Sequence, residues 1–273
     1  MQVAAEDAIN NILTDPDDPS AALVTMDPKT GYIKAMVGGK DFDNLKFNLA
    51  AQGKRQPGLT FKIFVLAAAM ENGFSPEMTF NPNGTVIFDM PVGDPWEVEN
   101  YMDTSYGDSE MAISEATVKS VNVVYAQLIM KVGAEKISRI ANNLGIQSYL
   151  ESYPAIGLGG LTIGVSPLEV CTAFSTIANY GHINQPTAIL KITDNDGNII
   201  YENEPQNQEI ISPINAYRII EIMEQAVQRG TGTRAKMDGY SIAGKTGTTD
   251  HGENAWFTGF TPNLATSGLD WLS

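Results

Sequence analysis

The sequence contains little cysteine and little positive charge. Its single cysteine, Cys171, excludes a disulfide bond within the chain. Cys171 falls on the apolar side of a predicted helix, and we interpret it as a buried thiol. Lysine and arginine together number 17 against 32 aspartates and glutamates, which gives a net charge of −15. Because phosphate groups are bound by clustered cationic side chains, this balance argues against a nucleic-acid-binding or anionic-membrane-binding surface.

Long apolar runs are missing too. The longest is far shorter than the roughly 20 residues that a membrane-spanning helix needs, and no signal peptide is recognisable at the start. Internal repeats and low-complexity tracts are also lacking. An apolar content of 43% is enough for a sizeable core, and no break in composition divides the 273 residues. The sequence therefore predicts one domain over residues 1–273.

Alternating apolar residues predict strands near both ends of the chain. Residues 22–26 and 33–37 alternate around an Asp-Pro-Lys-Thr-Gly turn, which indicates an antiparallel hairpin. Residues 241–245 and 256–260 indicate two adjacent strands, and residues 188–202 indicate a second hairpin. These strands lie in the first and last parts of the chain, apart from the second hairpin.

Helical periodicity fills most of the sequence between these strands. Predicted helices cover residues 1–13, 61–72 and 122–131. Ser166-Pro167-Leu168-Glu169 has the form of a capping box, and Ser212-Pro213 starts a further helix. Strands at both ends with helices between them indicate the α+β class.

Three short motifs follow one another along the chain. They are Leu59-Thr60-Phe61-Lys62, Ser120-Val121-Asn122 and Lys245-Thr246-Gly247-Thr248. Serine acyl-transferases that react with penicillin carry Ser-x-x-Lys, Ser-x-Asn and Lys-Thr-Gly in the same order. Two of the three motifs are intact here, whereas the first has its lysine but leucine in place of the serine.

Longer stretches around these motifs carry a more specific resemblance. They are residues 56–64, 157–169, 229–235, 243–249 and 254–262. On these residues the chain, from about Ala21 to about Thr266, resembles the transpeptidase domain of class A penicillin-binding proteins, the bifunctional peptidoglycan synthases. The resemblance implies an antiparallel sheet with helices on both faces, the fold that these domains share with serine β-lactamases. A serine β-lactamase itself is a poorer match, because the Trp256-Phe257 and 157–169 contexts are those of the synthases.

The resemblance assigns roles to three polar residues of the first two motifs. Lys62 would be the base beside the nucleophile, with its pKa lowered by burial and by the nearby Lys245. Ser120 would relay a proton to the leaving amine. Asn122, which we also predict as the N-cap of its helix, would hydrogen-bond both Lys62 and the substrate amide.

The third motif would bind the substrate. Lys245 would supply positive field, and the hydroxyl groups of Thr246 and Thr248 would hold the substrate carboxylate. Gly247 would let the strand approach the ligand closely. The backbone N–H groups of Leu59 and Thr248 would form the oxyanion hole, which survives the substitution because it uses the main chain. The resemblance implies neither a cofactor nor a metal ion.

Leu59 decides what chemistry the chain can perform. The family cross-links peptidoglycan stem peptides that end in D-Ala-D-Ala by serine acyl transfer, and β-lactams trap the same serine. Leucine has no lone pair to donate, and the hydroxyl of Thr60 is turned away because i, i+2 neighbours on a helix do not face each other. We therefore expect no covalent β-lactam adduct. A natural pseudoenzyme that binds stem peptide or a cell-wall partner is one explanation. A sequencing or assembly error that changed one base of a serine codon is another.

The chain also departs from the family at its ends. Family members continue after the Trp-Phe-x-Gly strand with another strand and a long C-terminal helix, whereas residues 263–273 begin such a strand and stop. The resemblance also leads us to expect that an upstream glycosyltransferase domain and a membrane anchor belong to a longer parent protein. The expectation is a truncated domain from a membrane-anchored parent on the extracytoplasmic face of the membrane. Its strand at 256–260 should then present an unpaired edge that promotes self-association.

Overall fold

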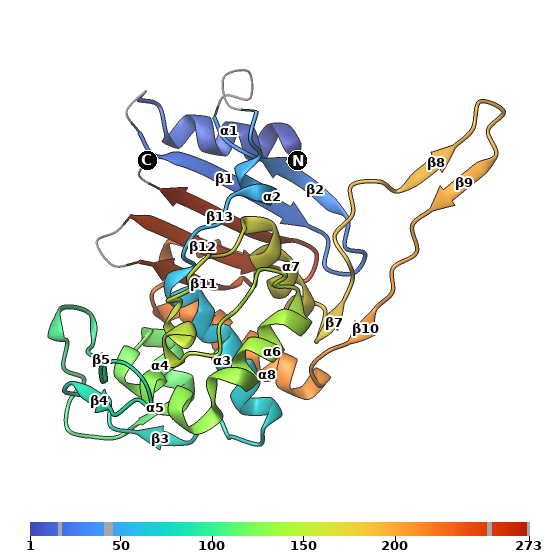
Figure 1. Ribbon diagram of the computed structural model, residues 1–273. Helices are drawn as coiled ribbons and strands as arrows, with labels where there is room; N and C mark the ends of the chain where they lie inside the picture. Colours follow the sequence, from blue (N-terminus) through green and yellow to red (C-terminus); the bar gives the residue numbers. More distant parts are fainter. Residues whose placement is uncertain (16–17, 41–45, 250–252, 272–273) are drawn as a thin grey trace.

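The computed structural model describes residues 1–15, 18–40, 46–249 and 253–271. Within these residues an antiparallel sheet of five strands has the order β11-β12-β13-β1-β2 (Figure 1). The strands are β1 (Ser20–Met26), β2 (Ile33–Val37), β11 (Ala243–Thr248), β12 (Asn254–Phe260) and β13 (Ala265–Trp271). The sheet therefore joins the two ends of the chain, as the positions of the predicted strands indicated.

The pairing of β13 corrects the expectation of an unpaired edge at residues 256–260. Strand β13 pairs with β12 over its whole length, from Asn254↔Trp271 to Phe260↔Ala265. Its other side pairs with β1, where Ser20 lies opposite Trp271. Because β13 lies between β12 and β1, β12 is an inner strand of the sheet and β11 is the edge strand at that end. The expectation that the family's C-terminal helix is missing from this chain stays a prediction.

Helices cover both faces of the sheet, which confirms the predicted fold class (Figure 1). On one face α1 (Gln2–Ile12) packs Ala5 and Ile9 against Ala35 and Val37 of the N-terminal hairpin. On the other face lie α7 (Pro167–Ala178) and α8 (Pro213–Arg229). Helix α3 (Lys62–Glu71) runs through the core beneath them, and every residue from Lys62 to Met70 is buried.

The remaining elements complete the helical side of the molecule. The helices are α2 (Leu49–Gln52), α4 (Ile113–Lys119), α5 (Asn122–Val132) and α6 (Ala134–Leu144), with short 3₁₀ turns η1 (Gly58–Phe61), η2 (Tyr101–Asp103), η3 (Pro154–Leu158) and η4 (Thr233–Ala235). Short antiparallel strand pairs are β3 (Thr79–Phe80) with β6 (Met111–Ala112), β4 (Val86–Phe88) with β5 (Trp96–Val98), β7 (His182–Ile183) with β10 (Gln208–Glu209), and β8 (Lys191–Thr193) with β9 (Ile199–Glu202).

Most local expectations agree with this structure, and one does not. The predicted helices, the second hairpin and the buried thiol of Cys171 are present. The capping box at Ser166 has both of its reciprocal hydrogen bonds. The N-cap of α5, however, is Val121, and Asn122 is the first helical residue. The prediction for Asn122 is wrong because its side chain bonds Lys62 instead of the helix backbone.

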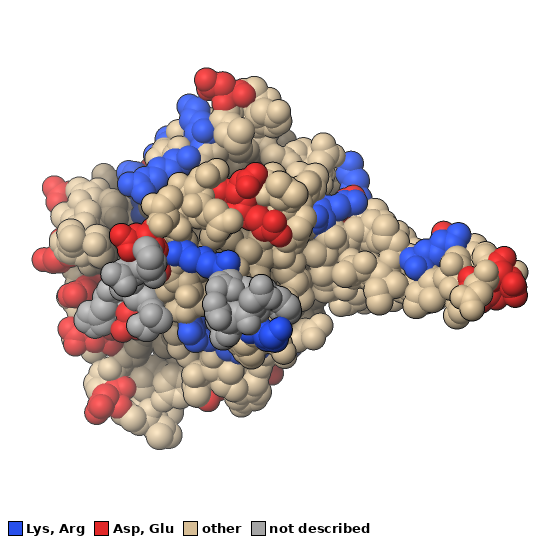
Figure 2. All heavy atoms as spheres, turned by 90° about the horizontal axis from the view of Figure 1, so that it is seen from above, with Lys and Arg blue, Asp and Glu red and all other residues tan. Residues whose placement is uncertain are grey.

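The β8–β9 hairpin projects away from the body of the molecule (Figures 1 and 2). All residues of both strands are exposed. In the view of Figure 2, Lys and Arg side chains lie scattered among Asp and Glu, and acidic side chains gather at the hairpin tip. No helix among the described residues is both long and apolar enough to cross a membrane.

Candidate active site

The three sequence motifs meet on one side of the buried helix α3. Turn η1 carries Leu59 directly into α3, and Ser120 lies in the turn between α4 and α5. Strand β11 brings Lys245 to the same place. A cleft of about 900 Å³ opens here, and its lining includes Leu59, Asn122 and Thr248.

Lys62 is fully buried on the first turn of α3. Its Nζ donates to the carbonyl oxygen of Ser120 at 2.7 Å and to Oδ1 of Asn122 at 2.7 Å. Among the described residues no carboxylate forms an ion pair with Lys62. Burial, followed by the charge of Lys245, holds the pKa of Lys62 well below its usual value. Whenever the amine loses its proton, its lone pair becomes free to accept one.

Lys245 approaches Ser120 from the opposite side. Its Nζ is fully buried and donates to Oγ of Ser120 at 2.9 Å and to the carbonyl oxygen of Thr246 at 3.0 Å. Burial lowers the pKa of Lys245 from 10.5 to about 7. Because Nζ of Lys62 lies 3.4 Å from the same hydroxyl oxygen, Ser120 stands between two amines and can pass a proton in either direction.

The backbone of Ser120 adopts a left-handed conformation, with φ 58° and ψ 43°. A residue with a side chain pays of order 1–3 kcal/mol in such a conformation, which persists only where the surroundings enforce it. Here the amide of Ser120 donates to Thr117 at 3.2 Å and that of Val121 donates to Ala116 at 2.9 Å, closing the end of α4. This turn directs both the carbonyl and the hydroxyl of Ser120 towards Lys62.

Asn122 connects the amine to the wall of the cleft. Its Oδ1 accepts from Lys62, and its Nδ2 donates to the carbonyl oxygen of Glu99 at 3.1 Å. The aromatic ring of Tyr125, one turn further along α5, lies 5.1 Å from Nζ of Lys62. Tyr125 is fully buried, and its hydroxyl is 2.6 Å from that of Thr117. Sequence reasoning missed Tyr125, because an aromatic residue in a buried helix normally signals only core packing.

Strand β11 and the turn after α8 form the other wall. The hydroxyl of Thr246 donates to that of Thr231 at 2.9 Å, and Thr248 is exposed at the strand end. The sequence marked residues 229–235 as a family-like turn without giving Thr231 a role. Its contact with Thr246 extends the row of hydroxyl groups beside Lys245.

Glycines allow β11 to touch the start of the helix. A Cβ atom at Gly247 would overlap the hydroxyl oxygen of Thr60 and the carbonyl oxygen of Pro57, and one at Gly58 would overlap the carbonyl oxygen of Thr248. The structure thus shows a close approach of Gly247 to Pro57 and Thr60, and its approach to a ligand stays a prediction. Since Thr249 donates to Asn254 of β12, the N–H of Thr248 points the other way, towards η1.

Leu59 occupies the position that Lys62 would serve. It lies three residues before Lys62, which places both on one side of a 3₁₀ turn, and it lines the cleft half-buried. The hydroxyl of Thr60 is fully buried and donates to the carbonyl of Pro57. Thr60 therefore has a structural hydroxyl group, and position 59 offers no nucleophile.

Comparison with known proteins agrees with this geometry. The family model described as the penicillin-binding protein transpeptidase domain matches residues 21–267. Penicillin-binding protein 1A of Aquifex aeolicus is 33% identical over 249 residues, which are 91% of this chain and 34% of that protein. Penicillin-binding protein 1A of Neisseria gonorrhoeae is 36% identical over 261 residues, 90% of this chain and 31% of that protein. The chain thus spans about a third of the length of these relatives.

Solved structures show the same fold. PonA1 of Mycobacterium tuberculosis in complex with penicillin V superposes with a TM-score of 0.86 at 26% identity, covering 100% of this chain and 74% of that one. Penicillin-binding protein 1A of Haemophilus influenzae gives a TM-score of 0.84 at 25% identity, covering 94% of this chain and 43% of that one.

Proposed function

The chain belongs to the penicillin-binding protein transpeptidase family, and from this premise we propose that it recognises the D-Ala-D-Ala end of a peptidoglycan stem peptide without forming an acyl-enzyme. One observation carries the proposal: the buried amine of Lys62, held by Ser120 and Asn122, stands one turn from a leucine. The residues to which the resemblance assigns recognition are all present around the cleft, whereas position 59 lacks the acylating oxygen.

Binding would use groups that the substitution leaves intact. The terminal carboxylate would accept hydrogen bonds from the hydroxyl groups of Thr246 and Thr248, in the field of Lys245. The carbonyl oxygen of the penultimate D-Ala would accept from the amides of Leu59 and Thr248. The first amides of a helix have no intrahelical acceptor, so the N–H of Leu59 in η1 is suited to this role. A β-lactam carries the same carboxylate and carbonyl and would occupy the site reversibly.

Acyl transfer would need an oxygen at position 59. A serine there would form a bond from Oγ to the carbonyl carbon while its proton passes to Lys62. The peptide C–N bond would then break, and the hydroxyl of Ser120 would protonate the departing D-Ala amine. Leucine supplies neither the electron pair nor the proton, and loss of such a nucleophile costs on the order of 10⁶-fold in kcat.

In its parent protein the domain would serve peptidoglycan assembly outside the cytoplasm. The relatives named above are about three times as long as this chain. As the family resemblance implies, the parent would carry a glycosyltransferase domain and a membrane anchor before the transpeptidase domain. We propose that a parent of this kind delivers the cleft to stem peptides, where it binds donor ends or, with serine at position 59, cross-links them.

Ligand-observed NMR with an acetylated D-Ala-D-Ala peptide tests the recognition step. We expect saturation transfer with a Kd around millimolar, about 4 kcal/mol of binding free energy. The L-Ala-L-Ala peptide is the control ligand, and the Thr246→Val, Thr248→Val double variant is the control protein. Both should lose the signal. Equal signals from the chain and the double variant would show that these hydroxyl groups bind no carboxylate.

A further inference from the structure

Residues 159–169 form a template for the loop that leads into the active site. Contacts between this segment and residues 54–58 run in antiparallel order, pairing 54 with 169, 55 with 165, 56 with 161, and 58 with 159. We propose that this template, with Glu169 and Gln56 as positioning residues, fixes the place of residue 59 and of its backbone N–H. The proposal rests on the proposed function at one point only, namely that the N–H of residue 59 donates a hydrogen bond to the substrate carbonyl oxygen.

The middle of the template holds the loop through paired hydrogen bonds. The amides of Arg55 and Val165 donate to each other's carbonyl oxygens at 3.0 and 2.9 Å. The side-chain amide of Gln56 bonds the backbone of Leu161 in both directions, with Leu161 N donating to Oε1 at 2.7 Å. From the sheet side, Nε1 of Trp256 donates to the carbonyl oxygen of Gln56 at 2.8 Å. The loop is thus clamped between the template and β12.

Glycines bring the two segments into direct contact. A Cβ atom at Gly159 would overlap the carbonyl group of Gly58, and one at Gly164 would overlap the backbone of Arg55. Both template glycines have φ +84°, a conformation that other residues rarely adopt. Two glycines of the segment 157–164, which the predicted site left without a role, are thus explained by this contact.

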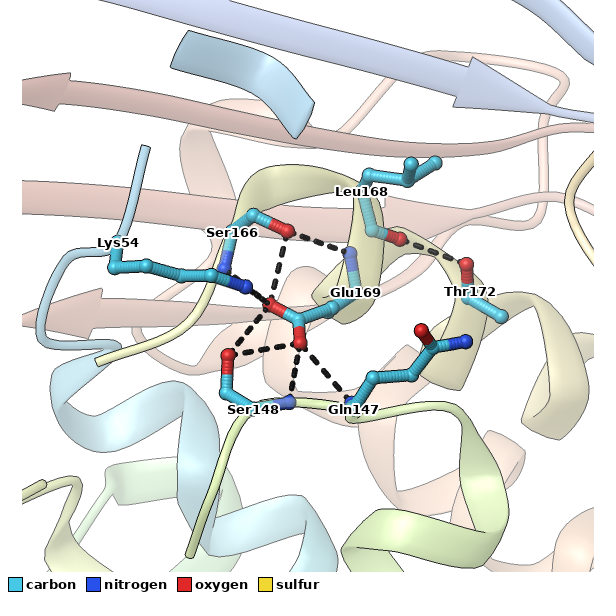
Figure 3. Close-up of polar contacts among 7 residues, drawn as sticks. All are labelled: Lys54, Gln147, Ser148, Ser166, Leu168, Glu169 and Thr172. Atoms are coloured by element: carbon cyan, nitrogen blue, oxygen red, sulfur yellow. Dashed lines mark hydrogen bonds and ion pairs between the residues drawn. The ribbon is translucent and has the colours of Figure 1, made fainter. Parts of the chain in front are cut away.

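Glu169 closes the far end of the template (Figure 3). Its carboxylate accepts from Nζ of Lys54 at 2.6 Å, from the amide of Ser166 at 2.7 Å, and from the amides of Ser148 and Gln147 at 2.6 and 3.0 Å. Only 9% of the Glu169 side chain is exposed. Burial alone would raise the pKa of Glu169, but the hydrogen bonds from Lys54, Ser166 and Ser148 outweigh it and hold the pKa below its usual value.

A capping box alone would not need this arrangement. Helix α7 requires only the exchange of hydrogen bonds between Ser166 and Glu169. The carboxylate also receives donors from two other segments, one of which is the active-site loop at Lys54. Since an error of about 1 Å in the position of a reacting group can cost roughly 10²-fold in rate, a fixed loop has a direct catalytic value.

The matched variants are Glu169→Gln and Glu71→Gln. Glu71 also accepts from the amide and hydroxyl of a helix-starting serine, Ser212, both at 3.0 Å, but it lies at the far end of α3. Lys54→Met is a milder second variant, which leaves the other donors to Glu169 in place. All are made both in the unmodified chain and in the Leu59→Ser background.

Two measurements compare these variants at temperatures equally far below their melting points. Hydrogen–deuterium exchange in the unmodified chain should be at least about 10-fold faster over residues 54–60 in Glu169→Gln, and unchanged in Glu71→Gln. In the Leu59→Ser background, the acylation rate constant with a fluorescent penicillin should fall at least about 10-fold in Glu169→Gln and by a smaller factor in Lys54→Met.

Equal effects of Glu169→Gln and Glu71→Gln on either measurement would overturn the template proposal, because both would then act through stability alone. If Leu59→Ser forms no adduct in any background, the proposed function fails at its acyl step. The exchange over residues 54–60 then decides the template proposal by itself.

Discussion

Lys62 and Lys245 approach one hydroxyl group, that of Ser120, from two sides. In the folded chain burial lowers the pKa of Lys245 from 10.5 to about 7. A lysine in the unfolded chain keeps a pKa near 10.4, so between about pH 7 and pH 10 the unfolded state binds more protons than the folded state. The free energy of unfolding should therefore rise with pH across this window.

Replacing Lys245 by methionine should remove part of this dependence. Relative to Lys245→Met, the unmodified chain should gain stability as pH rises from 7 to 10, by at most about 1.4 kcal/mol per pH unit. Urea unfolding followed by circular dichroism at pH 6, 8 and 9.5 measures the difference. Replacement of the exposed Lys29 by methionine is the control for the loss of a lysine from the surface. A flat difference for Lys245→Met would mean that its amine is still charged at pH 9.5 in the folded protein.

At the residue scale, motif order anticipated some contacts and missed others. The contact of Lys62 with Asn122 could be expected, because the family resemblance implied it. The contacts of Thr231 with Thr246 and of Tyr125 with Lys62 could not. These contacts depend on how a turn and a helix face pack in space. A threonine or a buried aromatic residue gives no sign in the local sequence of which residue it will contact.

At the element scale, the boundaries of β11 and α5 depend on the site. The predicted strand ended at Lys245, because Thr246, Gly247 and Thr248 are not an apolar alternation. The observed strand continues to Thr248, since Gly247 allows it to lie against η1. Similarly, Asn122 has the right chemistry for an N-cap, but bonds to Lys62 and Glu99 use its side chain and the cap falls on Val121.

Strand β13 should contribute far more to the stability of the fold than the β8–β9 hairpin does. Deleting residues 264–273 removes β13 from between β12 and β1, together with the buried side chains of Leu269 and Trp271. We expect the loss of cooperative thermal unfolding, because two strands lose their partner and the core is opened. Circular dichroism at 222 nm during heating measures it.

The matched control shortens the hairpin instead. Residues 191–202 are replaced by a Gly-Ser-Gly linker, which can close because the amide of Asn203 donates to the carbonyl of Leu190 at 2.9 Å. The melting temperature should stay within about 4 °C, since the exposed hairpin strands contribute little burial. A chain without residues 264–273 that melts as cooperatively as the full chain would contradict the central place of β13.

At the scale of the whole molecule, the sheet brings the two ends of the chain together. The α+β class and the N-terminal hairpin could be predicted, because strong period-2 patterns mark the strands. Strand β13 was underestimated, although Ala265, Ser267, Leu269 and Trp271 alternate as its buried residues. Two of these four are small, so the apolar signal is weak. Its pairing partner, β1, lies more than two hundred residues away in sequence, so no local sequence pattern could predict the pairing.

The central claim concerns the whole site: an intact binding cleft with no acylating atom at position 59. Intact-mass spectrometry after incubation with benzylpenicillin tests it most directly, on the unmodified chain, on Leu59→Ser and on the Leu59→Ser, Lys62→Met double variant. We predict no adduct on the unmodified chain, one adduct mapping to residue 59 in Leu59→Ser, and none in the double variant. A stoichiometric adduct on the unmodified chain, at Thr60 or at any other residue, would contradict the account.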